Sequence, residues 1–165
     1  MKKIAIIGTV EPTEQQRLYV RDFIASLDAD ATVMSGCARG IDTLALKCSK
    51  MRGLKTICYV PWERQFRYAD AVVALSSISE ALRAEAYESV KKYHPAENIG
   101  KVSFVFLARN YLIVYQADYV LALPSIAKRN LGGTGQGIRV AVGRGIPVKV
   151  IGENGQELQD VKPLL

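Results

Sequence analysis

The sequence has few cysteines, a single histidine and no long hydrophobic run. Its three cysteines, Cys37, Cys48 and Cys58, are odd in number and include no C-x-x-C pair. We therefore expect reduced thiols, as in the cytoplasm, and neither a disulfide framework nor a zinc site. The lone His94 lies in a polar stretch that predicts a solvated loop. The apolar run near the N-terminus is too short for a signal peptide or a membrane span, so we expect a cytoplasmic protein without a membrane segment. We also expect no metal and no other cofactor.

The composition is that of an ordinary globular protein with a basic surplus. Hydrophobic residues make up 49% and charged residues 23% of the 165 residues. The formal net charge of +6 indicates an anionic partner such as nucleic acid or a nucleotide. The length suits one substantial core, and no linker, repeat or low-complexity segment divides the chain. We predict a single domain over residues 1–165.

Short apolar runs alternate with helical patterns along the chain. Thr13 is a plausible N-cap with Gln16 three residues on, and Leu18 and Met51 are expected on the buried faces of the first two helices. Strands are predicted at 3–8, 32–34, 55–60, 118–123 and 147–151. Helices are predicted from Thr13 to near residue 28, and at 43–51, 69–93 with a break around 76–79, 101–117 and 132–142. This alternation predicts an α/β domain with a mainly parallel sheet.

Three glycine-bearing turns follow strands, at 8–9, 35–42 and 132–137. Residues 35–42 read S-G-C-A-R-G-I-D, where two glycines leave room for an anion, Arg39 adds a guanidinium and Asp42 is expected to cap the next helix. Ligands of parallel sheets bind at the carboxyl ends of strands, so these turns should share one crevice. The predicted phosphate- or nucleotide-binding residues are Gly8, Thr9, Ser35, Gly36, Ala38, Arg39, Gly40, Asp42, Arg109, Asn110, Gly132, Gly133, Thr134, Gly135 and Gln136.

Arg109 and Asn110 interrupt an apolar helix and therefore need polar partners. One interpretation is an internal ion pair or helix cap, and the other is that Arg109 points into the crevice as a ligand for an anion or a ribose. The glycine loop at 132–137 lacks the lysine pattern of a Walker-type site, and no G-x-G-x-x-G follows the first strand. ATP hydrolysis and nicotinamide binding are therefore not expected.

Several of these motifs together resemble a known family. The segment 35–42 resembles the S-G-x-A-x-G-I-D loop of the DNA-processing protein A family, and Arg109-Asn110 resembles its R-N-R-hydrophobic segment. The strand at 118–123, the glycine loop at 132–137 and G-I-P-V at 145–148 resemble the wider SLOG superfamily. The resemblance spans residues 3–151 and implies a Rossmann-like, doubly wound fold in three layers. It also implies a homodimer that binds single-stranded DNA in DNA processing or recombination, with the 35–42 loop on the phosphates.

An enzyme or sensor for nucleotides is the alternative. The lonely-guy phosphoribohydrolases of the same superfamily have P-G-G-x-G-T-x-x-E, whose glutamate assists cleavage of an N-glycosidic bond. Residues 132–139 have no glutamate at that place, and Gln136 cannot ionise, although Arg109 matches an upstream arginine. We therefore favour binding over catalysis. Four alternatives stay open: a phosphoribohydrolase, a deoxyribosyltransferase-like enzyme, a nucleotide receptor and an interaction protein with a vestigial pocket.

The loop at 62–68 contains aromatic residues and arginines. It either stacks bases of a nucleic acid or packs at the rim of the domain.

Overall fold

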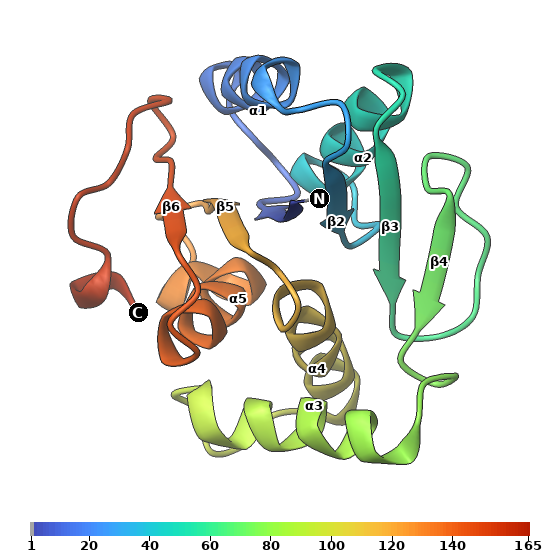
Figure 1. Ribbon diagram of the computed structural model, residues 1–165. Coiled ribbons are helices and arrows are strands. Elements are labelled where there is room, and N and C mark those ends of the chain that lie inside the picture. The colour runs from blue at the N-terminus through green and yellow to red at the C-terminus, as the bar shows by residue number, and fades with distance from the viewer. Residues whose placement is uncertain (1) are drawn as a thin grey trace.

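A six-stranded parallel sheet forms the centre of the structure, a computed structural model that describes residues 2–165 (Figure 1). The strands lie in the order β4-β3-β2-β1-β5-β6. The chain moves outward from β1 to β4 and then returns to place β5 on the other side of β1. This reversal puts the topological switch point between β1 and β5, where α/β sheets open a crevice. The strands are β1 (Lys3–Gly8), β2 (Thr32–Ser35), β3 (Lys55–Val60), β4 (Ala71–Ala74), β5 (Tyr119–Leu123) and β6 (Val148–Val150).

Helices cover both faces of the sheet, as a doubly wound, three-layered α/β fold requires (Figure 1). The side chains of β1 alternate between the faces: Ile4 and Ile6 pack beneath α1 and α2, whereas Ala5 and Ile7 pack beneath α4 and α5. Burial on both faces explains the continuous apolar run of this strand. The helices are α1 (Glu14–Ser26), α2 (Ile41–Met51), α3 (Glu80–Tyr93), α4 (Lys101–Val114) and α5 (Gly132–Gly143), with 3-10 turns η1 (Arg129–Leu131) and η2 (Lys162–Leu164). The predicted α/β class is confirmed.

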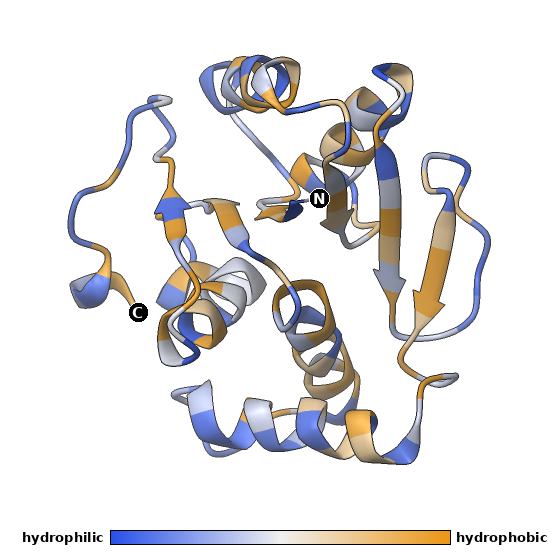
Figure 2. Ribbon diagram, in the orientation of Figure 1, coloured by the Kyte–Doolittle hydropathy of each residue, from blue (hydrophilic) through white to orange (hydrophobic). Residues whose placement is uncertain are grey.

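The helix α3 lies outside α4 and α5 rather than on the sheet (Figure 1). Figure 2 shows that α3 is largely hydrophilic along its length, whereas α4 and β4 are largely hydrophobic. α4 buries most of its apolar residues within the chain, leaving Val102 and Phe106 exposed. Among the described residues, no helix has the length and apolar character to cross a membrane.

The helix predicted at 69–93 is wrong in its first part, because the segment contains β4. Ala71–Ala74 has the sequence A-V-V-A, whose β-branched pair favours a strand, and it extends the sheet by pairing Val72 with Cys58. The helix α3 begins only at Glu80, after Ser79, whose hydroxyl accepts a hydrogen bond from the Leu82 N–H. The strand is short and half alanine, and it contains no helix-breaking residue. The sequence therefore does not separate it from the helix that follows.

Two further details of the helices differ from prediction. α2 begins at Ile41 with Gly40 as its N-cap, so Asp42 is inside the first turn and is not the cap. Leu18 and Met51 are 49% and 79% exposed, and α1 instead packs through Val20 and Ile24. Both misplaced residues are long apolar side chains at the edge of a broad helical stripe, where the sequence period does not separate rim from core.

The capping box of α1 is confirmed and is linked to the end of the sheet. The Gln16 N–H donates to Thr13 Oγ1 and the Thr13 N–H donates to Gln16 Oε1, each at 3.2 Å. The buried Gln16 also donates through Nε2 to the carbonyl of Pro124 at 2.9 Å. This residue therefore joins the start of α1 to the chain that leaves β5.

We expect Thr13→Ala to lower the free energy of unfolding by about 1–2 kcal/mol, because the Gln16 N–H at the start of α1 and the Glu153 carbonyl both lose the Thr13 hydroxyl as a partner. Urea denaturation followed by circular dichroism measures the change. Ser26→Ala is the matched control, since this exposed hydroxyl bonds only its own helix end, to the Phe23 carbonyl. Equal stability of wild type and Thr13→Ala would contradict a stabilising role for the cap.

Candidate nucleic-acid and nucleotide site

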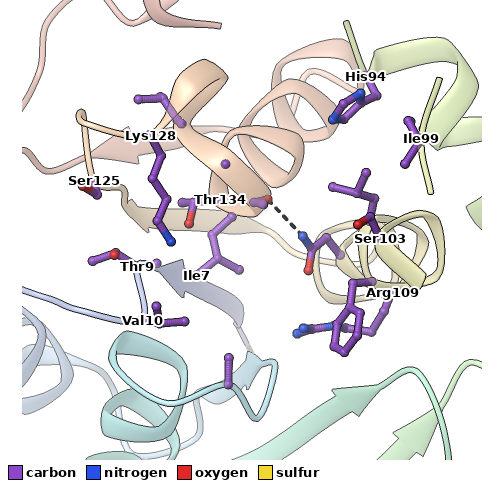
Figure 3. A pocket seen from close by; sticks show the side chains of 18 of the residues that line it. Ile7, Thr9, Val10, His94, Ile99, Ser103, Arg109, Ser125, Lys128 and Thr134 are labelled. Carbon is purple, nitrogen blue, oxygen red and sulfur yellow. Dashed lines mark hydrogen bonds between the residues drawn. The ribbon is translucent and has the colours of Figure 1, made fainter. Parts of the chain in front are cut away.

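A cavity of about 600 Å³ opens at the carboxyl edge of the sheet, at the switch point between β1 and β5. Its walls come from the loops after β1, β2 and β5, from the start of α5, from α4, and from the loop that joins α3 to α4. Figure 3 shows side chains from these elements converging on one space. The volume is in the range of small-molecule and cofactor sites.

A buried ion pair joins the two sides of the cavity. Arg109 from α4 places Nη1 3.6 Å from Oδ2 of Asp42 in α2, and both side chains are 8% exposed. Neither Nε nor Nη1 of Arg109 has a hydrogen-bond partner among the described residues. The guanidinium also lies over the Phe106 ring, 5.7 Å from its centroid. Both interpretations of Arg109 thus find support: it pairs internally, and it lines the cavity with donor capacity unused.

Glycine at position 36 is required for this arrangement. A Cβ atom built on Gly36 would overlap Nη1 of Arg109 and come within 2.4 Å of Oδ2 of Asp42. Gly40 has a similar role on the other side of the loop, with φ +88° and the carbonyl of Thr9 within 2.4 Å of its added Cβ. The glycines of the 35–42 loop therefore make room for protein atoms.

Burial raises the pKa of Asp42, while the Arg109 charge and hydrogen bonds from the Gly8 and Ala38 backbone act in the opposite direction. The carboxylate sits in the first turn of α2, whose positive pole it faces. The Ile41 N–H at the same helix end donates to the carbonyl of Thr9 at 3.1 Å. The start of α2 thus already has hydrogen-bond acceptors and a negative charge from within the protein.

The start of α5, like that of α2, has no side-chain cap, but its first turn contains no acidic residue. Asn110 Nδ2 donates to the Gly133 carbonyl at 2.9 Å and so fixes α4 against the first turn of α5 (Figure 3). Lys128 precedes this turn and lines the cavity together with Gly132 and Thr134. An uncapped helix N-terminus beside a lysine is a favourable place for an anion.

The chain enters α5 through a left-handed turn. Asn130 and Leu131 have φ of 51° and 57°, and Gly132 follows with φ 59°. Left-handed backbone is unfavourable for leucine, and such conformations concentrate at functional sites. Leu131 is buried and contributes to the cavity wall, which compensates for part of this cost.

An apolar wall faces the charged groups. Val102 and Phe106 of α4 line the cavity and are 62% and 40% exposed. The Trp62 ring meets Phe106 edge to face at 5.6 Å and is 51% exposed. Phe66 and Tyr68 instead pack against each other and against the core beneath α2, so the loop at 62–68 offers one aromatic side chain at this edge.

The structure brings many of the predicted binding residues into one wall. Those lining the cavity are Gly8, Thr9, Ala38, Asp42, Arg109, Asn110, Gly132, Gly133 and Thr134.

The other predicted residues have different surroundings. Ser35 is buried and donates to the Ile6 carbonyl, and Arg39 is 77% exposed and pairs with Glu11 at 3.4 Å. Gln136 is fully buried, where it donates to the Ser89 carbonyl and accepts from Arg139. Gly36, Gly40 and Gly135 each lie where an added Cβ would overlap neighbouring atoms.

Sequence reasoning missed several residues of the wall. His94 was predicted to be solvated, yet it lines the cavity, and burial lowers its pKa. Ser103, Ser125 and Lys128 also face the cavity (Figure 3). A lysine just before a glycine-opened helix is a detectable signal for Lys128. His94 and Ser103 have no comparable signal, because their position depends on how α3 and α4 pack on α5.

Known proteins share this arrangement of elements. The family model of DNA recombination-mediator protein A matches residues 1–159. The DNA processing protein A of Streptococcus pneumoniae is 24% identical, with a TM-score of 0.61 over 92% of this chain and 50% of that chain. This chain therefore spans about half the length of that protein. Among curated proteins, nothing matches.

Two other solved structures are similar. The DNA processing protein A of Helicobacter pylori, described for its single-stranded DNA binding mode, is 23% identical, with a TM-score of 0.56 over 96% of this chain and 67% of that chain. The molybdenum cofactor carrier protein of Chlamydomonas reinhardtii is 14% identical, with a TM-score of 0.57 over 91% and 76% of the two chains. At such identities these likenesses establish the fold.

We expect Asp42→Asn to lower the free energy of unfolding by about 3 kcal/mol, because it leaves the buried Arg109 charge without a counter-charge. Glu11→Gln is the matched control: it breaks the exposed pair with Arg39, which should cost less than about 1 kcal/mol. Urea denaturation at pH 7 compares the two variants. Equal losses would show that the Asp42–Arg109 pair is no more important than a surface contact.

Proposed function

Because this chain belongs to the DNA recombination-mediator protein A family, we propose that its cavity binds single-stranded DNA in DNA processing or recombination. The observation that supports this most is the underpaired, buried Arg109 guanidinium in the wall of a cavity that also contains Lys128 and the uncapped start of α5. Three positive groups from different elements thus face one space, which suits a phosphodiester.

In the proposed mode a backbone phosphate binds at the first turn of α5, with Lys128 as its counter-charge. Arg109 adds donors from the opposite wall. The neighbouring bases lie along the apolar wall, where the Phe106 ring and, next to it, the Trp62 ring offer faces or edges for stacking. The phosphate contacts supply affinity, and the aromatic contacts tolerate any base.

The proposed phosphate contacts differ from those that the sequence alone suggested. The 35–42 loop was expected to hold the phosphate, but its helix end already faces Asp42 and the Thr9 carbonyl. We therefore propose that this loop supports Arg109 through Gly36, and that α5 provides the backbone amides that bind the phosphate.

We keep as further proposals that the protein is a cytoplasmic homodimer and that the chain forms a single domain.

We expect Lys128→Ala to weaken binding of a fluorescein-labelled oligo-dT several-fold and to reduce the slope of log K against log salt by about 0.7, as for one lost phosphate contact on a single strand. Lys55→Ala is the matched control, since this exposed lysine begins β3 at the opposite edge of the sheet. Fluorescence anisotropy at several salt concentrations gives both quantities. Undetectable binding by the wild type, or equal effects of the two variants, would contradict the proposal.

A receptor or enzyme for mononucleotides is the second candidate, favoured by the cavity volume of about 600 Å³, which suits a small molecule. Catalysis of N-glycosidic cleavage needs a group that moves a proton, and Gln136 does not line the cavity. Among the described residues, Asp42 is the one carboxylic acid in the wall, and it is paired with Arg109. Without an unpaired carboxylate among the described residues of the wall, a cleavage mechanism would have to use His94 as its proton-transfer group.

We expect nucleoside monophosphates to raise the melting temperature less than an oligonucleotide at equal phosphate concentration, because they offer one phosphate and one base. We also expect no released base by chromatography after incubation. A larger shift with one mononucleotide would favour the receptor, and release of base would establish the enzyme.

A further inference from the structure

Two thiols meet at the base of the 35–42 loop. β2 and β3 pair in a register that sets Ser35 opposite Cys58, and Cys37 follows two residues after Ser35 in the loop that leaves β2. Both cysteines belong to the apolar cluster beneath α2, in which Cys58 is fully buried and Cys37 is half-buried. The two thiols are close enough for each to shift the pKa of the other. A solvent-accessible thiol thus has a buried thiol as its direct neighbour.

We propose that Cys37 and Cys58 form an oxidisable dithiol that is converted to a disulfide by a peroxide and that alters the wall of the cavity. The dithiol stands apart from the proposed function, whereas its effect on DNA affinity rests on that function.

The two cysteines have different roles in the proposed oxidation: Cys37 reacts with the peroxide, and Cys58 then forms the disulfide. The neighbouring Cys58 thiol lowers the pKa of Cys37 to about 7, with the positive charges of Arg64 and Arg109 acting in the same direction. The neighbouring Cys37 thiol and burial raise the pKa of Cys58. Cys37 is therefore the cysteine of the pair that ionises first, and its thiolate is the reactive form, whereas Cys58 stays a thiol.

The reaction proceeds in two balanced steps. The Cys37 thiolate attacks one oxygen of hydrogen peroxide, forming an S–O bond as the O–O bond breaks, and with one proton taken up the products are a sulfenic acid and water. The Cys58 sulfur, as it gives up its proton, then attacks the Cys37 sulfur, and the S–O bond breaks with release of a second water. Overall two thiols lose two electrons and the peroxide gains them.

The position of Cys37 gives this bond an effect on the cavity. Gly36, just before it, lies against Arg109 and Asp42 with no room for added atoms. Ala38, just after it, lines the cavity and accepts hydrogen bonds from the N–H and hydroxyl of Thr43. A disulfide brings the Cys37 sulfur to covalent distance from that of Cys58, and we expect both neighbours to move with it.

Peptide mapping by mass spectrometry tests the dithiol in the intact wild-type protein after treatment with hydrogen peroxide. We expect a disulfide between Cys37 and Cys58, reversed by dithiothreitol, with Cys48 still reduced. Cys48 on α2 is a matched internal control, because burial raises its pKa. A Cys37 that goes to sulfinic acid, or a disulfide that includes Cys48 or a second chain, would overturn the proposal.

A second measurement does not depend on oxidation. We expect the rate of Cys37 alkylation by iodoacetamide to rise with pH with a midpoint near 7, and a midpoint near the ordinary value of 9.0 would contradict the thiolate assignment. Cys58→Ala removes the neighbouring thiol and should move this midpoint upward.

The effect on the cavity is measured last, as oligo-dT affinity before and after oxidation in wild type and in Cys37→Ser. We expect a several-fold change in the wild type and none in the variant. Equal affinity of the oxidised and reduced wild type would overturn the coupling. If the reduced protein binds no oligonucleotide, the proposed function fails while the mapped disulfide still stands.

Discussion

The contact between Arg109 and Asp42 determines how the two halves of the molecule meet. α2 belongs to one helical layer and α4 to the other, and Asp42 and Arg109 meet at the carboxyl edge of the sheet. The pair is costly to bury, since both charges lose most of their water. Several features of the structure follow from keeping it: a glycine at position 36, hydrogen bonds to Asp42 from the end of β1 and from the loop after β2, and the aromatic ring of Phe106 beneath the guanidinium.

This contact also explains why the cavity is positive where it is. Asp42 neutralises the start of α2 and part of the Arg109 charge, so the remaining positive groups are Lys128, the free donors of Arg109 and the first turn of α5. These lie around the switch point between β1 and β5, which the strand order alone places there. The anionic part of a ligand therefore belongs nearer α5 than α2.

Much of the fold was predictable from the sequence, because local chemistry specifies it. β1 and β3 have continuous apolar runs ending at Gly8 and Pro61, and the capping box fixes the start of α1. β4 was not predictable, because A-V-V-A is helix-compatible and becomes a strand only by pairing with β3. The start of α2 was misplaced because Asp42 has the residue type of a cap but is turned toward Arg109, a partner 67 positions away in the sequence.

The candidate site was predictable where glycine marks a strand-to-helix turn and not where packing brings residues together. Gly132–Thr134 and Gly8 line the cavity as such turns do, whereas His94 and Ser103 enter it because α3 and α4 pack on α5. The 35–42 motif located the right edge of the sheet. Its most exposed cation, Arg39, pairs with Glu11, and this outcome depends on the conformation of the loop after β1.

The most direct test of the central claim is a map of amide chemical-shift changes in the ¹⁵N-labelled protein on titration with oligo-dT. The account predicts that the largest changes fall at Gly132, Gly133 and Thr134 and at the Arg109 Nε–H, with little change at the amino edge of the sheet. Changes concentrated away from the cavity, with α5 and Arg109 unaffected, would contradict it.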